Sequence, residues 1–153
     1  MTAKNEVRFS ELSTYQGRKR SFPNNWYSIH PQETLSPHVM AKAGFYYIRG
    51  DLVKCYYCEK ELENWEEDDN VYKEHRDHAN YCPFVKMFPT NAPDKITFSQ
   101  ALILERERIF FILDRDFAKW ESELRLVVRE GINEAIKEGE KASKPRKYKK
   151  VKK

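Results

Sequence analysis

Residues 55–82 read CYYCEKELENWEEDDNVYKEHRDHANYC, with three cysteines and one histidine in the order Cys55-x2-Cys58-x16-His75-x6-Cys82. Three thiolates and one imidazole are a ligand set of a tetrahedral structural zinc. A single turn can hold the Cys-x2-Cys pair, while His75 and Cys82 can reach the same ion from a following helix and its exit. Four protein ligands leave no position for water or substrate, so the pattern predicts one structural zinc ion and argues against zinc catalysis. The alternative is three buried thiols and a core histidine that bind no metal.

Composition and charge limit the class of protein. All 3 cysteines of the 153-residue chain lie in this pattern, which leaves none for a disulfide. No apolar run resembles a signal peptide or a membrane span, so we expect a soluble nuclear or cytosolic protein without a membrane partner. Residues 141–153 carry eight Lys or Arg and no acid, so the net charge of +4 becomes −4 without them. This tail is either solvated charge or a non-specific, salt-dependent contact with DNA.

The predicted fold class is α+β, with short helices around a three-stranded antiparallel sheet in residues 18–84, after an N-terminal arm over 1–17. Ser36 and Pro37 are typical of a helix start, and Gly44 of its end. Alternating short runs predict strands over 45–48, 52–55 and 61–64. We expect Asp68 or Asp69 to cap a helix that carries His75 and His78.

The C-terminal part of the chain predicts one long helix. Residues 83–94 contain three prolines, which indicates a linker, placed over 85–96, that no helix crosses unbroken. Thr97-x-x-Gln100 is a capping-box pattern, and it predicts a helix over 97–139, with Gly139 as its stop and a disordered tail over 140–153. At 1.5 Å per residue this helix would span roughly 60 Å, which is too long to fold against the zinc domain.

An apolar stripe along this helix predicts a partner-binding surface. Its members recur at helical spacing: Leu102, Ile109, Leu113, Phe117, Trp120, Leu124, Val127 and Val128. Further apolar side chains broaden the stripe beyond the seam of a two-stranded coiled coil. We therefore expect a bundle with more than one other helix, and the alternatives are folding back on the zinc domain or self-association.

Acidic residues surround the predicted metal site. Nine acids and three bases lie between Glu59 and Asp77, a net charge of −6, so the natural ligand is cationic. Strand alternation would place Glu61 and Glu63 on one face and Leu62 on the other, with Trp65 just beyond. Such a groove could bind a peptide by strand addition, with the acids holding a free N-terminal ammonium group.

The motifs from Arg18 to Phe84 resemble a known family. They are Arg20-x-Phe22, Trp26, Ala43-Gly44-Phe45-Tyr46-Tyr47, Gly50-Asp51-x-Val53-x-Cys55-x2-Cys58, Leu62-x2-Trp65, Asp68-Asp69, His75-x2-His78 and Cys82-x-Phe84. Together they resemble a baculoviral IAP repeat (BIR). One repeat followed by a long helix, without further cysteines for a RING, is similar to the survivin-like or deterin-like branch of that family.

The resemblance implies a non-enzymatic scaffold of the chromosomal passenger complex in cell division. In that branch the long helix joins borealin and the inner centromere protein, which delivers Aurora B kinase, and the zinc domain reads a histone tail that begins Ala-Arg-phosphoThr. The implied locations are nucleus and cytoplasm, and during division the centromere, spindle midzone and midbody. No phosphate loop, nucleophile–base pair or carboxylate dyad in the sequence indicates an enzyme.

The resemblance also assigns roles in the groove by position. Leu62 and Trp65 would line the alanine pocket, Glu63 and Asp69 would hold the terminal ammonium, and Lys60 with His78 would face the phosphate. These assignments have alternatives. Leu62 and Trp65 could be core, Glu63 and Asp69 ordinary surface charge or a cap, and His78 a solvated residue or a replacement for His75 as ligand.

Two departures and one competing function follow from the same comparison of motifs. Arg49 stands where the branch has an acid, which would repel a basic peptide, and Ala101 stands where it has the phenylalanine of a homodimer contact, which argues against homodimerisation. The competing function is an inhibitor of apoptosis that binds caspases or Ala-starting antagonist peptides. Caspase inhibitors of the family carry an aromatic residue where this chain has His78.

Overall fold

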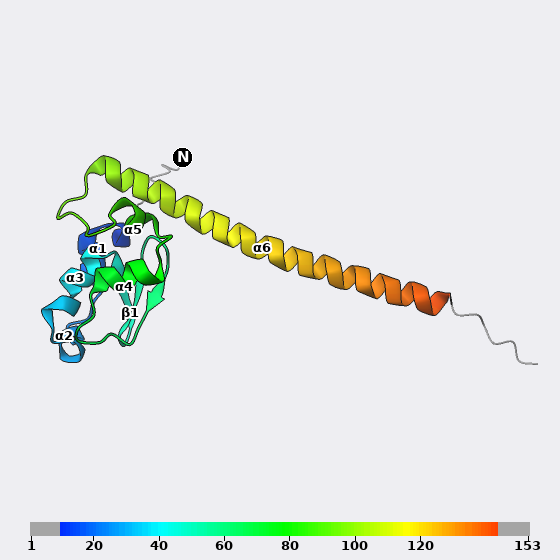
Figure 1. The fold of residues 1–153 in the computed structure, drawn as a ribbon, viewed down its shortest axis with the longest axis horizontal. Coiled ribbons are helices and arrows are strands. Elements are labelled where there is room, and N and C mark those ends of the chain that lie inside the picture. The colour runs from blue at the N-terminus through cyan, green and yellow to red at the C-terminus, as the bar shows by residue number, and fades with distance from the viewer. Residues whose placement is uncertain (1–9, 144–153) are drawn as a thin grey trace, which may run out of the picture. The chain divides into compact units, whose positions relative to one another are not determined.

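The structure is a computed structural model that describes residues 10–143, in two compact units that divide between Ile112 and Leu113. The parts of the predicted arm and tail at 1–9 and 144–153 lie outside the described residues. Short helices, one sheet and the first turns of a long helix make up the first unit (Figure 1). The elements in chain order are η1 Glu11–Ser13, α1 Tyr15–Arg20, α2 Trp26–Ile29, η2 Glu33–Leu35, α3 Pro37–Lys42, β1 Phe45–Arg49, β2 Leu52–Cys55, β3 Glu61–Leu62, α4 Val71–His78, α5 Pro83–Met87 and α6 Phe98–Ala142.

The predicted α+β fold is confirmed, and α3 begins and ends as its sequence indicates. The Ser36 side chain accepts a hydrogen bond from the Val39 N–H at 3.4 Å, and Pro37 occupies the first turn. Gly44 follows the helix with φ of +96°, in the left-handed region that favours glycine. A Cβ at this position would stand 3.4 to 3.6 Å from Tyr57, Phe84 and the sulfur of Cys55. The turn after α3 therefore lies directly against the segment from Cys55 to Cys58.

The sheet is antiparallel with the order β1-β2-β3, so β3 is an edge strand. Phe45 pairs with Cys55 across β1 and β2, and Val53 pairs with Leu62 across β2 and β3. The third strand is shorter than predicted, because it ends at Leu62 and Asn64 adopts φ of +63°. Asn is one of the few residues that occupies this left-handed region at modest cost.

The expected cap of α4 was wrong. Asn70, not Asp68 or Asp69, is the N-cap, and its Oδ1 accepts from the Lys73 N–H at 2.9 Å. The carboxylate of Asp69 instead accepts from the Glu66 N–H at 2.9 Å and closes the turn before the helix. The prediction that α4 carries both His75 and His78 is confirmed.

The proline-rich segment contains a short helix that the sequence reading did not expect. α5 begins at Pro83, where a proline fits because the first turn of a helix needs no N–H donor. Its residues Phe84 and Val85 are buried in the core. The prolines that follow interrupt the chain before α6, so no helix runs from α5 into α6, as predicted.

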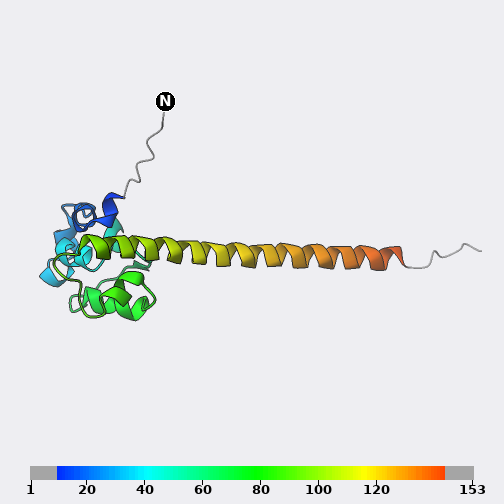
Figure 2. The ribbon, with the colours of Figure 1, turned by 90° about the horizontal axis from the view of Figure 1, so that it is seen from above.

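The long helix α6 is one continuous element, seen from above in Figure 2. The capping box is confirmed, since Thr97 Oγ1 accepts from the Gln100 N–H at 3.2 Å and Gln100 Oε1 accepts from the Thr97 N–H at 2.9 Å. Gly139 does not stop the helix, which runs to Ala142, because good helix formers follow the glycine and the Ser143 N–H still bonds to its carbonyl. Of the described helices, none is long and apolar enough to span a membrane.

The first turns of α6 differ from the expectation that the helix stays clear of the zinc domain. Leu104 and Glu105 are buried, and Phe111 packs against the core of the first unit. The second unit contains only the rest of α6 and the residues after it.

Candidate metal centre and peptide groove

Four segments bring the predicted ligands together. Cys55 ends β2, Cys58 lies in the turn that follows, His75 lies on α4, and Cys82 is the N-cap of α5. All four are buried, and their ligand atoms lie within 4.8 Å of one another. The sequence therefore identified the complete cluster. His78 is exposed and outside it, which excludes the alternative that His78 replaces His75.

The distances suit one tetrahedral zinc ion. The sulfurs of Cys55 and Cys82 are 3.9 Å apart, and the sulfur of Cys58 is 3.6 Å from His75 Nε2. Zn–S bonds of about 2.3 Å in a tetrahedron place two sulfurs about 3.8 Å apart. The Cys3His group is thus arranged to bind one zinc ion, and its four ligands fill the coordination sphere.

Neighbouring groups orient the ligands. His75 Nδ1 donates to the Ala43 carbonyl at 2.9 Å, which leaves Nε2 to face the metal position. The Tyr57 N–H donates to the sulfur of Cys55 at 3.3 Å. The ring of Phe45 packs against the imidazole, with centroids 4.6 Å apart.

The charge state of the thiols also calls for a cation. Burial raises the pKa of Cys55 well above its usual value and raises the pKa of Cys82 to about 12. The pKa of Cys58 is lowered, because its sulfur accepts hydrogen bonds from Cys55 and Cys82. Three adjacent buried thiolates are therefore unfavourable unless a metal ion compensates their charge.

The predicted groove residues lie along and beyond the edge strand β3. Leu62 is half-buried in the strand, and Glu63 follows it as an exposed residue. Trp65 is 9% exposed, its ring packs edge-on against Phe45, and its Nε1 has no hydrogen-bond partner. Trp65 is thus part of the core, and its indole N–H is buried without a partner.

The charged members of the groove are accessible. Lys60 and Asp69 are half-buried. His78 is exposed on the last turn of α4, with its Nδ1 3.1 Å from the Glu74 carbonyl and 3.5 Å from the Glu74 carboxylate. The roles of these residues in binding stay predictions.

Sequence reasoning missed a residue that shapes the groove. The carboxylate of Asp51 accepts from the Asn64 N–H at 2.8 Å and so supports the left-handed residue between Glu63 and Trp65. In the sequence, Asp51 stands out only as part of the motif Gly50-Asp51-x-Val53. The signal that could have found it is an acid in the turn before β2 together with an Asn, which tolerates a left-handed backbone, just after β3.

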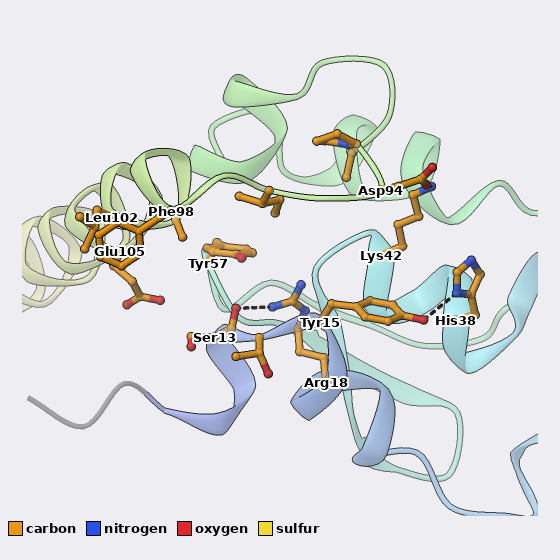
Figure 3. A pocket seen from close by; sticks show the side chains of 15 residues that line it. Ser13, Tyr15, Arg18, His38, Lys42, Tyr57, Asp94, Phe98, Leu102 and Glu105 are labelled. Atoms are coloured by element: carbon orange, nitrogen blue, oxygen red, sulfur yellow. Dashed lines mark hydrogen bonds and ion pairs between the residues drawn. The ribbon is translucent and has the colours of Figure 1, made fainter.

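A cavity of about 580 Å³ lies elsewhere in the first unit, between α1, α3 and the start of α6 (Figure 3). Arg18, Lys42 and Tyr57 line it together with Leu102 and Glu105 of α6. The buried guanidinium of Arg18 donates to the carbonyls of α3 and of the N-terminal turn. None of the zinc ligands or predicted groove residues lines this cavity.

All eight residues of the predicted partner surface are exposed on α6. They are Leu102, Ile109, Leu113, Phe117, Trp120, Leu124, Val127 and Val128. Leu102 and Ile109 belong to the first unit and the other six to the second.

Comparison with known families agrees with this geometry. The family model described as BIR, Inhibitor of Apoptosis domain, matches residues 18–86. Residues 18–86 are therefore similar to a BIR domain. The match contains all four zinc ligands and all the predicted groove residues, and it ends within α5.

Relatives match over the BIR region. Baculoviral IAP repeat-containing protein 5 is 39% identical over 79 residues in Cavia porcellus and 40% over 77 residues in Mus musculus, covering 49% and 48% of this chain and 54% of each relative. Baculoviral IAP repeat-containing protein 3 of Homo sapiens is 51% identical over 57 residues, 37% of this chain and 9% of that protein. The matched region is thus about half the length of the first two relatives.

Proposed function

We propose that the protein is a non-enzymatic scaffold subunit of the chromosomal passenger complex in mitosis and cytokinesis. The observation that carries the proposal is the exposed apolar side of α6 in the second unit. Phe117 and Trp120 are each 67% exposed, and Leu124 and Val127 are each 64% exposed. A water-exposed apolar surface of this extent marks an interaction site.

The breadth of that surface favours helical partners. Leu126 and Ile132 are exposed beside the main stripe, so more than one neighbouring helix can pack against α6. We infer that borealin and the inner centromere protein are these partners, and that Aurora B kinase joins through the latter. The similarity to Baculoviral IAP repeat-containing protein 5 supports this inference.

The zinc domain would read a histone tail that begins Ala-Arg-phosphoThr. The edge strand β3 can pair with an extended peptide, and Leu62 with Trp65 would receive the alanine side chain. Glu63 and Asp69 would hold the terminal ammonium, whereas Lys60 and His78 would contact the phosphate. This reading places the protein in nucleus and cytoplasm, and during division at the centromere, spindle midzone and midbody.

Titration of the full chain with fluorescent Ala-Arg-Thr and Ala-Arg-phosphoThr peptides tests the reader function. We expect the phosphorylated peptide to bind about tenfold more tightly, and Lys60→Ala to remove most of that preference. Lys86→Ala, an exposed lysine on α5, is the matched control. Equal affinity for the two peptides contradicts the reader function.

Co-expression tests the scaffold function separately. The full chain with the helical segments of borealin and inner centromere protein should elute as one soluble assembly. Phe117→Glu should prevent assembly, because it places a charge on the apolar surface, while Ala118→Glu adds the same charge beside it and should be tolerated. A wild-type chain that elutes alone contradicts the scaffold function.

A second candidate function is inhibition of apoptosis. It is favoured by the BIR match and by relatives such as Death-associated inhibitor of apoptosis 2 of Drosophila melanogaster, 43% identical over 60 residues. The same groove could bind caspases or Ala-starting antagonist peptides. Caspase inhibition by stoichiometric full-length protein would place this function above the first.

A further inference from the structure

The residues that hold the start of α6 are neighbours of the zinc ligands in the chain. Tyr56 lies between Cys55 and Cys58, and Tyr81 directly precedes Cys82. Both tyrosines contact α6 within the first unit. The metal ligands and the contacts to the helix are thus carried by the same two short segments.

The contacts themselves are specific. The guanidinium of Arg108 stands 4.6 Å from the ring centroid of Tyr56, and its Nε donates to the Glu105 carboxylate at 3.1 Å. Phe111 stacks on Tyr81, with centroids 5.5 Å apart and ring planes 9° apart. Cation–π and aromatic contacts of this kind are directional, so they depend on the tyrosines being held in place.

One side of α6 makes all these contacts, and we name it the docking face. Leu104, Arg108 and Phe111 follow at spacings of four and three, which places them on one side of a helix. Leu104 is 1% exposed, and Glu105 is also buried. Their neighbours Arg106 and Phe110 lie away from it, with Phe110 56% exposed.

The loop from Cys55 to Cys58 connects the metal ligands with the contacts to α6. The Tyr57 N–H donates to the sulfur of Cys55, and the Tyr57 ring stacks on Phe84 with centroids 4.7 Å apart. Phe84 in turn follows Cys82 by two residues. Displacing the loop that carries Tyr56 would therefore disturb a ligand bond, a core contact and a helix contact together.

We propose that zinc binding and the packing of the docking face of α6 on the zinc domain stabilise each other, and we call this coupling the latch. Zinc fixes Tyr56 and Tyr81 where they receive Arg108 and Phe111, and the docked helix in turn slows release of zinc. Such coupling is reciprocal, because two events that favour the same arrangement strengthen each other. A partner that binds the docking face in place of the zinc domain would consequently weaken zinc retention. This coupling requires the metal site and the docked start of α6, and it does not depend on histone or caspase binding.

The rate of zinc transfer from the full-length protein to a chromogenic chelator tests the latch. Arg108→Ala and Phe111→Ala should accelerate release by about fivefold or more, the low end of typical coupling between sites. Arg106→Ala and Phe110→Ala remove the same atoms from the exposed side of the same helix and should leave the rate unchanged. Equal rates for the docking-face and exposed-side variants would overturn the proposal.

A core variant separates coupling from general loss of stability. Trp26→Phe alters the ring contacts of the buried Trp26 with Phe22, His30 and the half-buried Tyr47, none of which adjoins a ligand in sequence. The latch predicts that Phe111→Ala, or the milder Phe111→Leu if the alanine variant does not fold, releases zinc faster than Trp26→Phe at equal loss of unfolding free energy. If release depends only on unfolding free energy across all variants, the latch is refuted.

Discussion

The two units of the molecule differ in whether their apolar side chains are buried or exposed. The first buries large ones such as Trp26, Phe45 and Phe84 around its metal ligands, whereas the second buries none of its described residues, 113–143. A helix without packing partners depends on helix propensity and on pairs such as Glu121 with Arg125. The first unit is thus specified by its own residues and a metal, whereas the second unit exposes its apolar side chains to solvent.

Of all changes, removal of zinc should affect the two units most differently. Binding of structural zinc contributes about 10 kcal/mol or more in zinc-finger peptides, so a strong chelator should unfold the first unit. We expect loss of the near-UV circular dichroism of its aromatic core, while much of the far-UV helical signal from α6 persists. A protein that keeps its near-UV spectrum after verified loss of zinc would contradict the claim that the first unit depends on the metal.

Two leucines of α6 test the same contrast within one helix. Leu104 is 1% exposed in the first unit and Leu124 is 64% exposed in the second. Leu104→Ala should lower the free energy of unfolding of the first unit by about 2–5 kcal/mol, because it opens a cavity in a packed core. Leu124→Ala leaves no cavity and should change that value by less than about 0.5 kcal/mol. Urea denaturation followed by tryptophan fluorescence measures both, and similar losses would contradict the assignment of the units.

Features fixed by short-range chemistry could be predicted from the sequence. The spacing of Cys55, Cys58, His75 and Cys82 defined the metal cluster because ligand number and type are restricted. The start of α3 and the capping box of α6 followed from Ser36 and Thr97, whose hydroxyls bond to nearby backbone. Such features can be predicted from residue type and spacing, without knowing how distant segments pack.

Features decided by distant residues could not be predicted. Leu102 and Leu104 look alike in the sequence, but only Leu104 is buried, because Tyr56 and Tyr81 fix which side of α6 docks. α5 forms since its side chains enter the core, a tertiary effect that outweighs a proline-rich composition. Asp68 or Asp69 was expected to cap α4, but the Asp69 carboxylate accepts from the Glu66 N–H and Asn70 caps the helix instead.

Replacement of glycine by alanine should change stability in opposite directions in the two units. Gly44 has φ of +96° and is packed against Tyr57, Phe84 and Cys55, so Gly44→Ala should destabilise the first unit by about 1–2 kcal/mol. Gly131 lies within α6 with open space around its Cα, so Gly131→Ala should stabilise the helix by about 1 kcal/mol. Thermal melts followed at 222 nm should show a cooperative zinc-dependent transition that moves down in the first variant, and a broad helical transition that moves up in the second. No described residue of α6 in the second unit is buried, so helix propensity should limit the stability of this part of the helix. If the broad transition of Gly131→Ala stays unchanged, propensity does not limit that stability, and packing contacts stabilise the helix instead.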